Sequence, residues 1–478
     1  MEQRAKYYQN KPLSFDQVGN IATELSAVLR SAGYIAGKVI IPEQAFRQGG
    51  NLYYKVIPGV LDTPEIKNSS RFSTERLTGQ VSATQCGQGS LTSCPANVDV
   101  LTGSAMLLNE MPGIAARYSL EPGTKPGTTR VVADVRDAER INGYAGMDNH
   151  SNEDTGKNRY VAGLTLSNLT GFGDRFRSDL TLSTSGDLFT GSADYSFPVG
   201  LTGMRAGVNY AHTDYVLNGQ YASLQASGKA DTYTAWLSKP VYRTPAFSAD
   251  SRLEVATEET QDDLDYFAIH QKRQITHADA SLSGNVTTEE GAGSFSYGIL
   301  YGNARLRDDY SGALDELLHT AGNFAVFHHD TSAEIPVMDG LSFWTRLHGQ
   351  FTSRNLSPSH KFVLGGPDGV RAYGSSDGVL DQGHIFSAEV RRRFSLPVSD
   401  QHLTLTAAAF FDQGWGEYNR HSPGPVKNFV DASAAGLWLG VTDNSLYEAR
   451  ATWAQRTGNA ITTAQDRSQF WLSGYLYF

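Results

Sequence analysis

Two short segments carry the side chains best suited to specific chemistry in this sequence. Residues 365–373 read Gly-Gly-Pro-Asp-Gly-Val-Arg-Ala-Tyr and present the guanidinium of Arg371. Residues 411–414 read Phe-Asp-Gln-Gly and present the carboxylate of Asp412. A guanidinium and a carboxylate can form two parallel charge-assisted hydrogen bonds, so the segments predict an ion pair that ties a loop to a fixed element. On the residues alone, a solvated loop arginine is the simpler interpretation.

Motifs of enzymes and nucleotide-binding proteins are absent from the sequence. It contains no His-Glu-x-x-His and no Gly-x-Ser-x-Gly, and no Lys-Ser/Thr follows Gly365-Gly366 in P-loop spacing. Twelve histidines are scattered along the chain. The acidic run from Glu258 to Asp265 indicates an exposed loop, with a cation site as the alternative. We therefore predict no catalytic centre, no metal site and no cofactor, and we expect a protein that is not an enzyme.

The elements that would position Arg371 and Asp412 are predicted by an alternation that begins near residue 141. Thr404, Thr406 and Asp412 fall on one face of a strand, opposite Leu405 and Phe411. Soluble sheets also alternate. Here, however, the polar positions repeatedly hold charged residues, and no helical pattern interrupts the alternation, which favours a hydrated barrel lumen. At about 20 residues per strand and connection, residues 141–478 predict about 16 strands, within a range of roughly 14–18.

The last strand carries the sharpest local signal for a membrane barrel. Five residues of one face alternate up to the chain end: Phe470, Leu472, Gly474, Leu476 and Phe478. A final strand that ends in Phe is the familiar targeting signature of bacterial outer-membrane barrels, so Leu476 and Phe478 are its candidate targeting residues. No run of about 20 apolar residues suits a membrane helix. The net charge of −10 argues against nucleic acid as the main partner.

The first 140 residues indicate two small units, each a helix followed by a hairpin. Ser14 and Gln17 form a capping box for a helix that stops near Gly33, and strands over 38–41 and 52–57 follow. Asn97 caps a second helix that Pro112-Gly113 ends, before strands over 115–120 and 129–135. The polar stretch 68–96 is interpreted as a linker or as an unrecognised first strand of the second unit.

These units suggest binding modules, because an exposed edge strand can add an incoming extended peptide to its sheet. The candidate binding residues on their strands are Tyr54, Val56, Val131 and Val135. Cys86 and Cys94 are the two cysteines, and they are either a short-loop disulfide or two unrelated thiols. The first residues lack the apolar core of a signal peptide.

On these motifs, the chain resembles the outer-membrane transporters of two-partner secretion, the haemolysin and haemagglutinin exporters. These belong to the superfamily of BamA-like barrels that carry periplasmic POTRA domains. The resemblance covers nearly the whole chain, and its POTRA matches are Gly33-Tyr34, residues 42–44, 56–59, 107–113 and 120–123. Family members carry a Val-Arg-Gly-Tyr motif at the tip of a loop folded into the barrel. Here Val370, Arg371, Ala372 and Tyr373 stand at that motif, with Ala in place of Gly.

The resemblance implies a mainly β protein, with two α/β POTRA domains before an antiparallel transmembrane barrel of about 16 strands. The expected boundaries are 1–67 for an N-terminally incomplete first POTRA domain, 68–139 for the second and 140–478 for the barrel. It further implies that Asp412 and Gly414 line the lumen, where Asp412 pairs with the loop arginine. Met1–Asn10 is not expected to form a plug helix in the barrel.

The implied function is export of a large secreted exoprotein of the haemolysin, adhesin or contact-dependent toxin type. The unfolded partner would dock on periplasmic POTRA domains and thread through the outer-membrane barrel. Further implied partners are the barrel assembly machinery and the lipid and lipopolysaccharide of the outer membrane. The alternative is an assembly factor for other barrels, although two POTRA units suit an exporter better.

Overall fold

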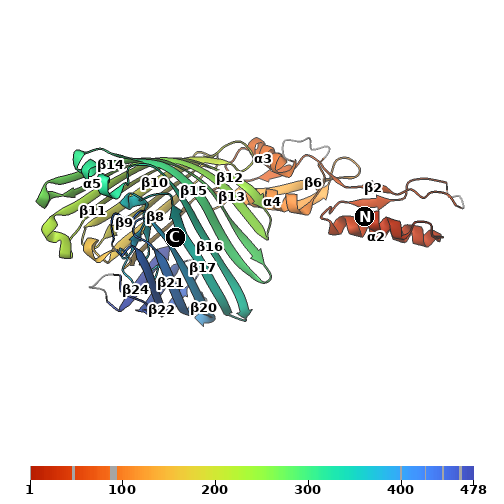
Figure 1. The fold of residues 1–478 in the computed structure, drawn as a ribbon. Helices are drawn as coiled ribbons and strands as arrows, with labels where there is room; N and C mark the ends of the chain where they lie inside the picture. Colours follow the sequence, from red (N-terminus) through yellow and green to blue (C-terminus); the bar gives the residue numbers. More distant parts are fainter. Residues whose placement is uncertain are drawn as a thin grey trace.

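A closed antiparallel barrel of 16 strands forms the body of the molecule (Figure 1). The computed structural model describes residues 2–45, 49–86, 94–398, 401–425, 427–443, 446–461 and 466–478. The barrel closes where the last strand pairs with the first, from Ser473 opposite Asp148 to Tyr477 opposite Tyr144. The predicted strand number is therefore confirmed. In chain order the barrel strands are β7 (Ile141–Asp148), β8 (Arg159–Ser167), β9 (Arg175–Ser183), β10 (Leu188–Pro198), β11 (Arg205–Val216), β12 (Ala226–Arg243), β13 (Phe247–Leu264), β14 (Ile269–Thr288), β15 (Gly291–Leu306), β16 (Gly322–Met338), β17 (Leu341–Thr352), β20 (Gln382–Val398), β21 (Gln401–Glu417), β22 (Phe429–Thr442), β23 (Tyr447–Arg456) and β24 (Ser468–Tyr477).

The two faces of the strands separate as the alternation predicts. In β24 the side chains of Phe470 and Leu476 are exposed on the outer wall, whereas that of Trp471 is buried on the inner side. In β21, Phe411 is 43% exposed, whereas its neighbour Asp412 has no exposed surface. Outward apolar residues suit lipid, and this parity places the carboxylate of Asp412 inside the barrel.

Two details of the barrel differ from the sequence prediction. The acidic run from Glu258 is not a loop: most of it forms the end of β13, which is 18 residues long. Strands of this length exceed the 9–11 residues that cross a membrane, so the barrel wall continues beyond the bilayer with polar residues on both faces. The prediction of no helix is also wrong, because α5 (Asp309–Leu318) follows β15 and is capped by the side chain of Asp308.

The second N-terminal unit is a single four-stranded sheet with two helices. Its elements are β3 (Val60–Leu61), β4 (Glu65–Asn68), α3 (Thr74–Cys86), α4 (Val98–Asn109), β5 (Ile114–Pro122) and β6 (Thr128–Asp137). The central strand β6 pairs in parallel with β3 and β4 on one side and antiparallel with β5 on the other. Asn97 caps α4 as predicted.

The stretch 68–96 was interpreted wrongly as a linker or as the first strand of the second unit, because it contains the helix α3. Only Leu77 and Val81 mark its buried face at helical spacing, and the helix also buries the polar side chains of Gln80 and Gln85. The expected boundary after residue 67 is wrong as well. Strands β3 and β4 pair with β6, so the second unit begins near Val60.

The first N-terminal unit lies at the end of the molecule away from the barrel (Figure 1). It comprises α1 (Glu2–Tyr7), α2 (Phe15–Ser31), β1 (Lys38–Ile40) and β2 (Lys55–Ile57). The predicted capping box of Ser14 and Gln17 is present. Arg4 and Tyr8 both contact the carboxylate of Glu24 at 2.6 Å, so α1 and the residues after it pack on α2 and not inside the barrel.

The second unit is anchored to one rim of the barrel by an ion cluster. Arg243, at the end of β12, donates two hydrogen bonds to Glu110, at 2.7 and 3.0 Å, and one to Asp250 at 2.7 Å. The arginine side chain is only 8% exposed. Close packing adds to this anchor, since a Cβ on Gly103 of α4 would stand 2.7 Å from the carbonyl oxygen of Arg243. Within the described residues, no helix is both long and apolar enough to cross a membrane.

Candidate functional site

A long loop between β17 and β20 folds back into the barrel and carries the predicted motif. Within it, η5 (Pro358–His360) is followed by β18 (Phe362–Val363), which pairs with β19 (Val379–Leu380) to form the stem. The tip beyond the stem is tight: the backbone N–H of Val370 donates to the carbonyl of Leu364, and that of Tyr373 to the carbonyl of Val370. Ala372 is not among the residues with positive φ. The tip therefore adopts its turn without a glycine at position 372.

The structure brings Arg371 and Asp412 together, as the family resemblance implies. Nε of Arg371 donates to Oδ2 of Asp412 at 2.9 Å, and Nη2 donates to Oδ1 at 2.7 Å. The backbone N–H of Arg371 adds a third bond to Oδ2 at 3.1 Å. Such a two-pronged pair fixes the orientation of the guanidinium as well as its position. Arg371 is 4% exposed and Asp412 0%, so the pair is shielded from solvent.

A second carboxylate, which the sequence analysis missed, completes the site. Glu389 of β20 accepts a hydrogen bond from Nη1 of Arg371 at 2.6 Å. Its other oxygen accepts bonds from Nε of Arg391 at 2.7 Å and from the indole N–H of Trp438 at 3.0 Å. The two buried carboxylates thus face two arginines, of which Arg391 also pairs with Glu334 at 3.3 Å. The alternation of residues along β20 could have indicated this site, because Glu389 and Arg391 lie on the same face of the strand as Ser387.

Two aromatic side chains also contact Arg371, one at its guanidinium and one at its backbone carbonyl. The guanidinium carbon lies 3.4 Å from the ring centroid of Phe410, which is a cation–π geometry. The indole N–H of Trp471 in β24 donates to the backbone carbonyl of Arg371 at 2.8 Å. Burial alone would lower the pKa of Arg371, but its hydrogen bond to Asp412 and the negative charges of Asp412 and Glu389 raise that pKa above its ordinary value. The arginine therefore stays charged.

Small residues on the inner wall make room for the loop tip. An added Cβ on Gly414 would stand 2.6 Å from Cγ2 of Val370 and 2.7 Å from Cδ1 of Leu364, so a side chain at this position would displace the loop tip. Val370 and Tyr373 pack into an apolar cluster with residues of β21, β22 and β23, and Tyr373 donates to the carbonyl of Asn459 at 2.7 Å. The small members of this cluster on the inner wall are Ala408, Ala432, Ala434 and Ala454.

The base of the loop is fixed by a separate buried carboxylate, Asp381. Its Oδ1 contacts Nζ of Lys361 at 2.7 Å and accepts from the backbone N–H of Leu356 at 3.0 Å. Its Oδ2 accepts from the backbone N–H of Arg420, which belongs to the connection between β21 and β22, at 2.8 Å. Tip and base are thus both tied to the barrel, and the loop is a built-in part of the lumen.

The predicted partner-binding residues of the N-terminal units do not lie together. Val56 is 45% exposed on β2, whereas the hydroxyl of Tyr54 donates to the carbonyl of Val18 at 3.0 Å. Val131 and Val135 are 0% exposed on β6, whose two edges are both occupied by other strands. Their placement corrects the prediction, because hydrophobic alternation marked the core of the second unit and not a binding edge.

The predicted cysteine pair lies between the two helices of the second unit. Cys86 and Cys94 form a disulfide, with their Cα atoms 5.6 Å apart. Among the described residues, no cluster of three or more potential ligands could hold a metal ion.

Comparison with known proteins identifies the family. The family model described as haemolysin secretion/activation protein ShlB/FhaC/HecB matches residues 127–442, and that of the ShlB-type POTRA domain matches residues 1–59. The chain belongs to this haemolysin secretion/activation family. It is 30% identical to the heme/hemopexin transporter protein HuxB of Haemophilus influenzae, over 98% of this chain and 82% of that protein. It is 24% identical to the outer membrane transporter CdiB of Dickeya dadantii, over 91% of this chain and 75% of that protein.

Solved structures show the same fold. CdiB from Escherichia coli superposes with a TM-score of 0.80 at 18% identity, covering 100% of this chain and 87% of that one. BamA from Haemophilus ducreyi lacking POTRA domains 1–3 gives a TM-score of 0.57 at 13% identity, covering 98% and 94%. As a member of its family, the protein is an outer-membrane transporter of two-partner secretion with POTRA domains in the periplasm. The exporter prediction is confirmed over that of an assembly factor.

Gly414→Val should displace the loop tip of this transporter while sparing the barrel. The new side chain would overlap Val370 and Leu364, so we expect a larger and noisier single-channel conductance in planar bilayers. Gly474→Val is the matched control, because a Cβ at Gly474 would meet nothing within 4 Å. Wild-type conductance in the Gly414 variant would show that the position of the loop tip does not depend on the space at Gly414.

Asp412→Asn should weaken the seating of the loop by about 3–5 kcal/mol, since it leaves a buried guanidinium short of one charge. We expect loop cleavage by added protease to rise at least tenfold in the purified protein. Asp431→Asn, on the neighbouring strand, is the control, because Asp431 is exposed. Equal cleavage of the two variants would contradict a clamp at Asp412.

Proposed function

We propose that an unfolded exoprotein passes through the lumen beside the clamped loop, and that the clamp of Arg371 holds the route in its working shape. The observation that carries the proposal is the buried contact of Arg371 with both Asp412 and Glu389. All of the tip's partners described above lie on strands β20 to β24 or on the connections between them. The tip thus covers one part of the inner wall, and the base of the loop reaches β13 to β16, where His360 approaches Glu258 at 3.5 Å and Leu356 packs beside Ile275 and Phe324.

The remaining inner wall is polar, and several of its charged side chains are paired with one another. The indole N–H of Trp236 donates to Asp194 at 2.8 Å, and Arg273 pairs with Asp262 at 2.9 Å. His328 also approaches Asp279 at 2.7 Å. A surface whose charges satisfy one another offers a passing chain water and hydrogen bonds without strong fixed charges, which supports transit over tight binding.

The partner would first meet the periplasmic POTRA domains. Strand β2 pairs with β1 alone and β5 with β6 alone among the described strands, so each leaves an edge for an added strand. Val56 on β2 and Leu120 on β5 are each 45% exposed near these edges. Strand addition depends on hydrogen bonds to the backbone of the partner, so it suits a partner that arrives unfolded.

The cargo class is a further part of this proposal. The name HuxB says heme/hemopexin transporter, and the identity of 30% over nearly the whole chain exceeds the 24% with CdiB. These identities favour an exoprotein that acts on haem or hemopexin over a contact-dependent toxin. We further propose that the barrel assembly machinery recognises Leu476 and Phe478 during insertion, and that lipid and lipopolysaccharide surround the wall.

Arg371→Ala should abolish export while leaving the barrel in the outer membrane. Without the guanidinium, the tip loses its contacts to both carboxylates, so we expect at least a tenfold fall in exoprotein in the medium. Immunoblots of the culture medium and of heat-modifiable barrel in outer membranes measure the two effects. Arg420→Ala is the matched control, because its side chain is exposed in a neighbouring connection. Normal secretion by correctly inserted Arg371→Ala protein would refute the proposed role.

A further inference from the structure

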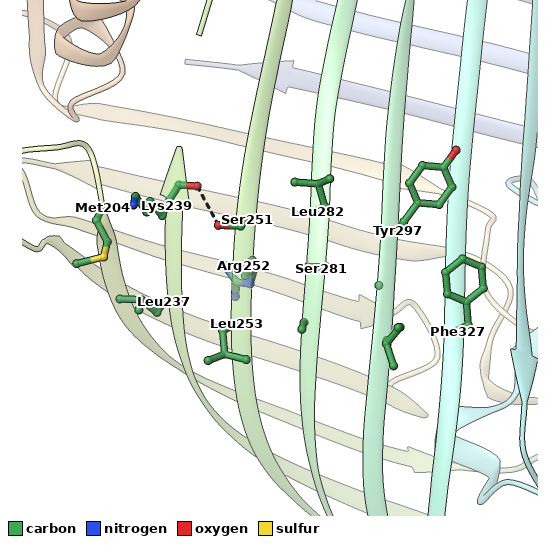
Figure 2. A pocket seen from close by; sticks show the side chains of 13 residues that line it. Met204, Leu237, Lys239, Ser251, Arg252, Leu253, Ser281, Leu282, Tyr297 and Phe327 are labelled. Atoms are coloured by element: carbon green, nitrogen blue, oxygen red, sulfur yellow. Dashed lines mark hydrogen bonds between the residues drawn. The ribbon is translucent and has the colours of Figure 1, made fainter. Parts of the chain in front are cut away.

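Side chains on the outer wall of the barrel differ in size, and over strands β12 to β16 they leave a groove. The groove has a volume of 530 Å³ (Figure 2). This size falls within the range of about 300–1,000 Å³ that small-ligand sites occupy. Its walls are apolar side chains that point outward: Leu237, Leu253, Leu282, Tyr297, Ile299 and Phe327.

The groove exists because two small residues interrupt the outward rows of large ones. Ser251 pairs with Leu282, and Ala280 pairs with both Leu253 and Ile299, so each small residue lies between bulky neighbours. The hydroxyl of Ser251 donates to the backbone carbonyl of Lys239 at 3.3 Å, so it lies along the neighbouring strand and leaves the floor low. The low floor of the groove therefore follows from the strand register, which places Ser251 and Ala280 between larger residues.

The depth of the groove in the membrane is set by an aromatic cluster at its periplasmic end. The ring centroids of Tyr242 and Phe247 are 5.7 Å apart, those of Phe247 and Phe295 6.0 Å, and those of Phe295 and Tyr297 5.9 Å. Aromatic girdles of this kind mark the membrane interface of barrels. Arg243, next to Tyr242, contacts the periplasmic second unit, so this girdle belongs to the periplasmic leaflet.

A positively charged side chain, that of Lys239, lies where the groove meets the aromatic cluster. Lys239 is exposed on the outer wall beside Met204 and opposite Ser251 (Figure 2). Within the described part of the chain, no carboxylate lies within 4.0 Å of its Nζ. A lysine can lay its alkyl stem on apolar surface and hold its ammonium at the interface, where it attracts lipid phosphate.

We propose that this groove binds one glycerophospholipid of the periplasmic leaflet. An acyl chain lies over Ser251 and Ala280 between the leucines, and the phosphate of the headgroup contacts Lys239. The charge of the phosphate is opposite to that of the Lys239 ammonium, and the apolar side chains that line the groove suit an acyl chain. The site is separate from the lumenal clamp, because its side chains point to the opposite face of the wall.

Native mass spectrometry of the delipidated full-length protein in detergent tests the proposal. The probes are 1-palmitoyl-2-oleoyl-phosphatidylglycerol and a diacylglycerol with the same chains but no phosphate. We expect one bound phosphatidylglycerol per protein, with at least a fivefold preference over diacylglycerol. Lys239→Gln should remove the preference, whereas Ala280→Phe, which fills the groove, should lower binding of both lipids at least fivefold.

Ala409→Phe is the matched control, because Ala409 is an exposed alanine on the outer wall of β21. It should bind both lipids like the wild type. Ser251→Phe fills the same groove and replaces Ala280→Phe if heat-modifiability shows that the latter is not folded. Equal binding of the two lipids by the wild type, or equal losses in the Ala280 and Ala409 variants, would overturn the proposal and leave only bulk lipid on this wall.

Discussion

The buried guanidinium of Arg371 is the constraint on which the rest of the lumen depends. A charge removed from water must be paired and hydrogen-bonded, and a broken buried pair costs about 3–5 kcal/mol. Asp412 and Glu389 can satisfy Arg371 only if the loop tip reaches the inner wall. The loop must therefore fold into the barrel, and the wall at that point must be smooth enough to receive it. Gly414 and the alanines of β21 to β23 meet this second requirement.

This constraint divides the inside of the barrel into two regions with different chemistry. On the side of β20 to β24 an apolar cluster packs against the loop tip around the buried ion pairs of Asp412 and Glu389 with Arg371. On the side of β10 to β16 the wall carries ion pairs such as Arg273 with Asp262, and a smaller apolar cluster around Ile275 receives Leu356 of the loop base. The POTRA domains complete the path at the periplasmic rim, where Arg243 joins the second unit to the barrel. A partner captured by strand addition, as we propose, would therefore meet a rim whose position relative to the second unit is fixed.

Features that depend on local pattern were predictable from the sequence. Alternation assigned Asp412 to the lumen and Phe478 to the outer wall, and capping residues located the starts of α2 and α4. The family resemblance, and not the pattern, paired Arg371 with Asp412. Features that depend on tertiary contacts were missed. The helix α3 buries Gln80 and Gln85 beside two apolar residues, so its amphipathic signal is weak. Glu389 became recognisable only when β20 and β21 were placed side by side, with Ser387 opposite Asp412.

The central claim is that cargo passes through the lumen beside the clamped loop, and site-specific photocrosslinking tests it most directly. A photoreactive phenylalanine analogue would be placed in β12 at Thr234, which shares the inward parity of Trp236, and in a second strain at the adjacent Tyr233, which is 52% exposed on the outer wall. With export stalled by a folded domain fused to the exoprotein, we predict crosslinks to the exoprotein from position 234 and none from position 233. Crosslinks from position 233 alone, or from neither position while the stalled exoprotein remains bound, would contradict the account.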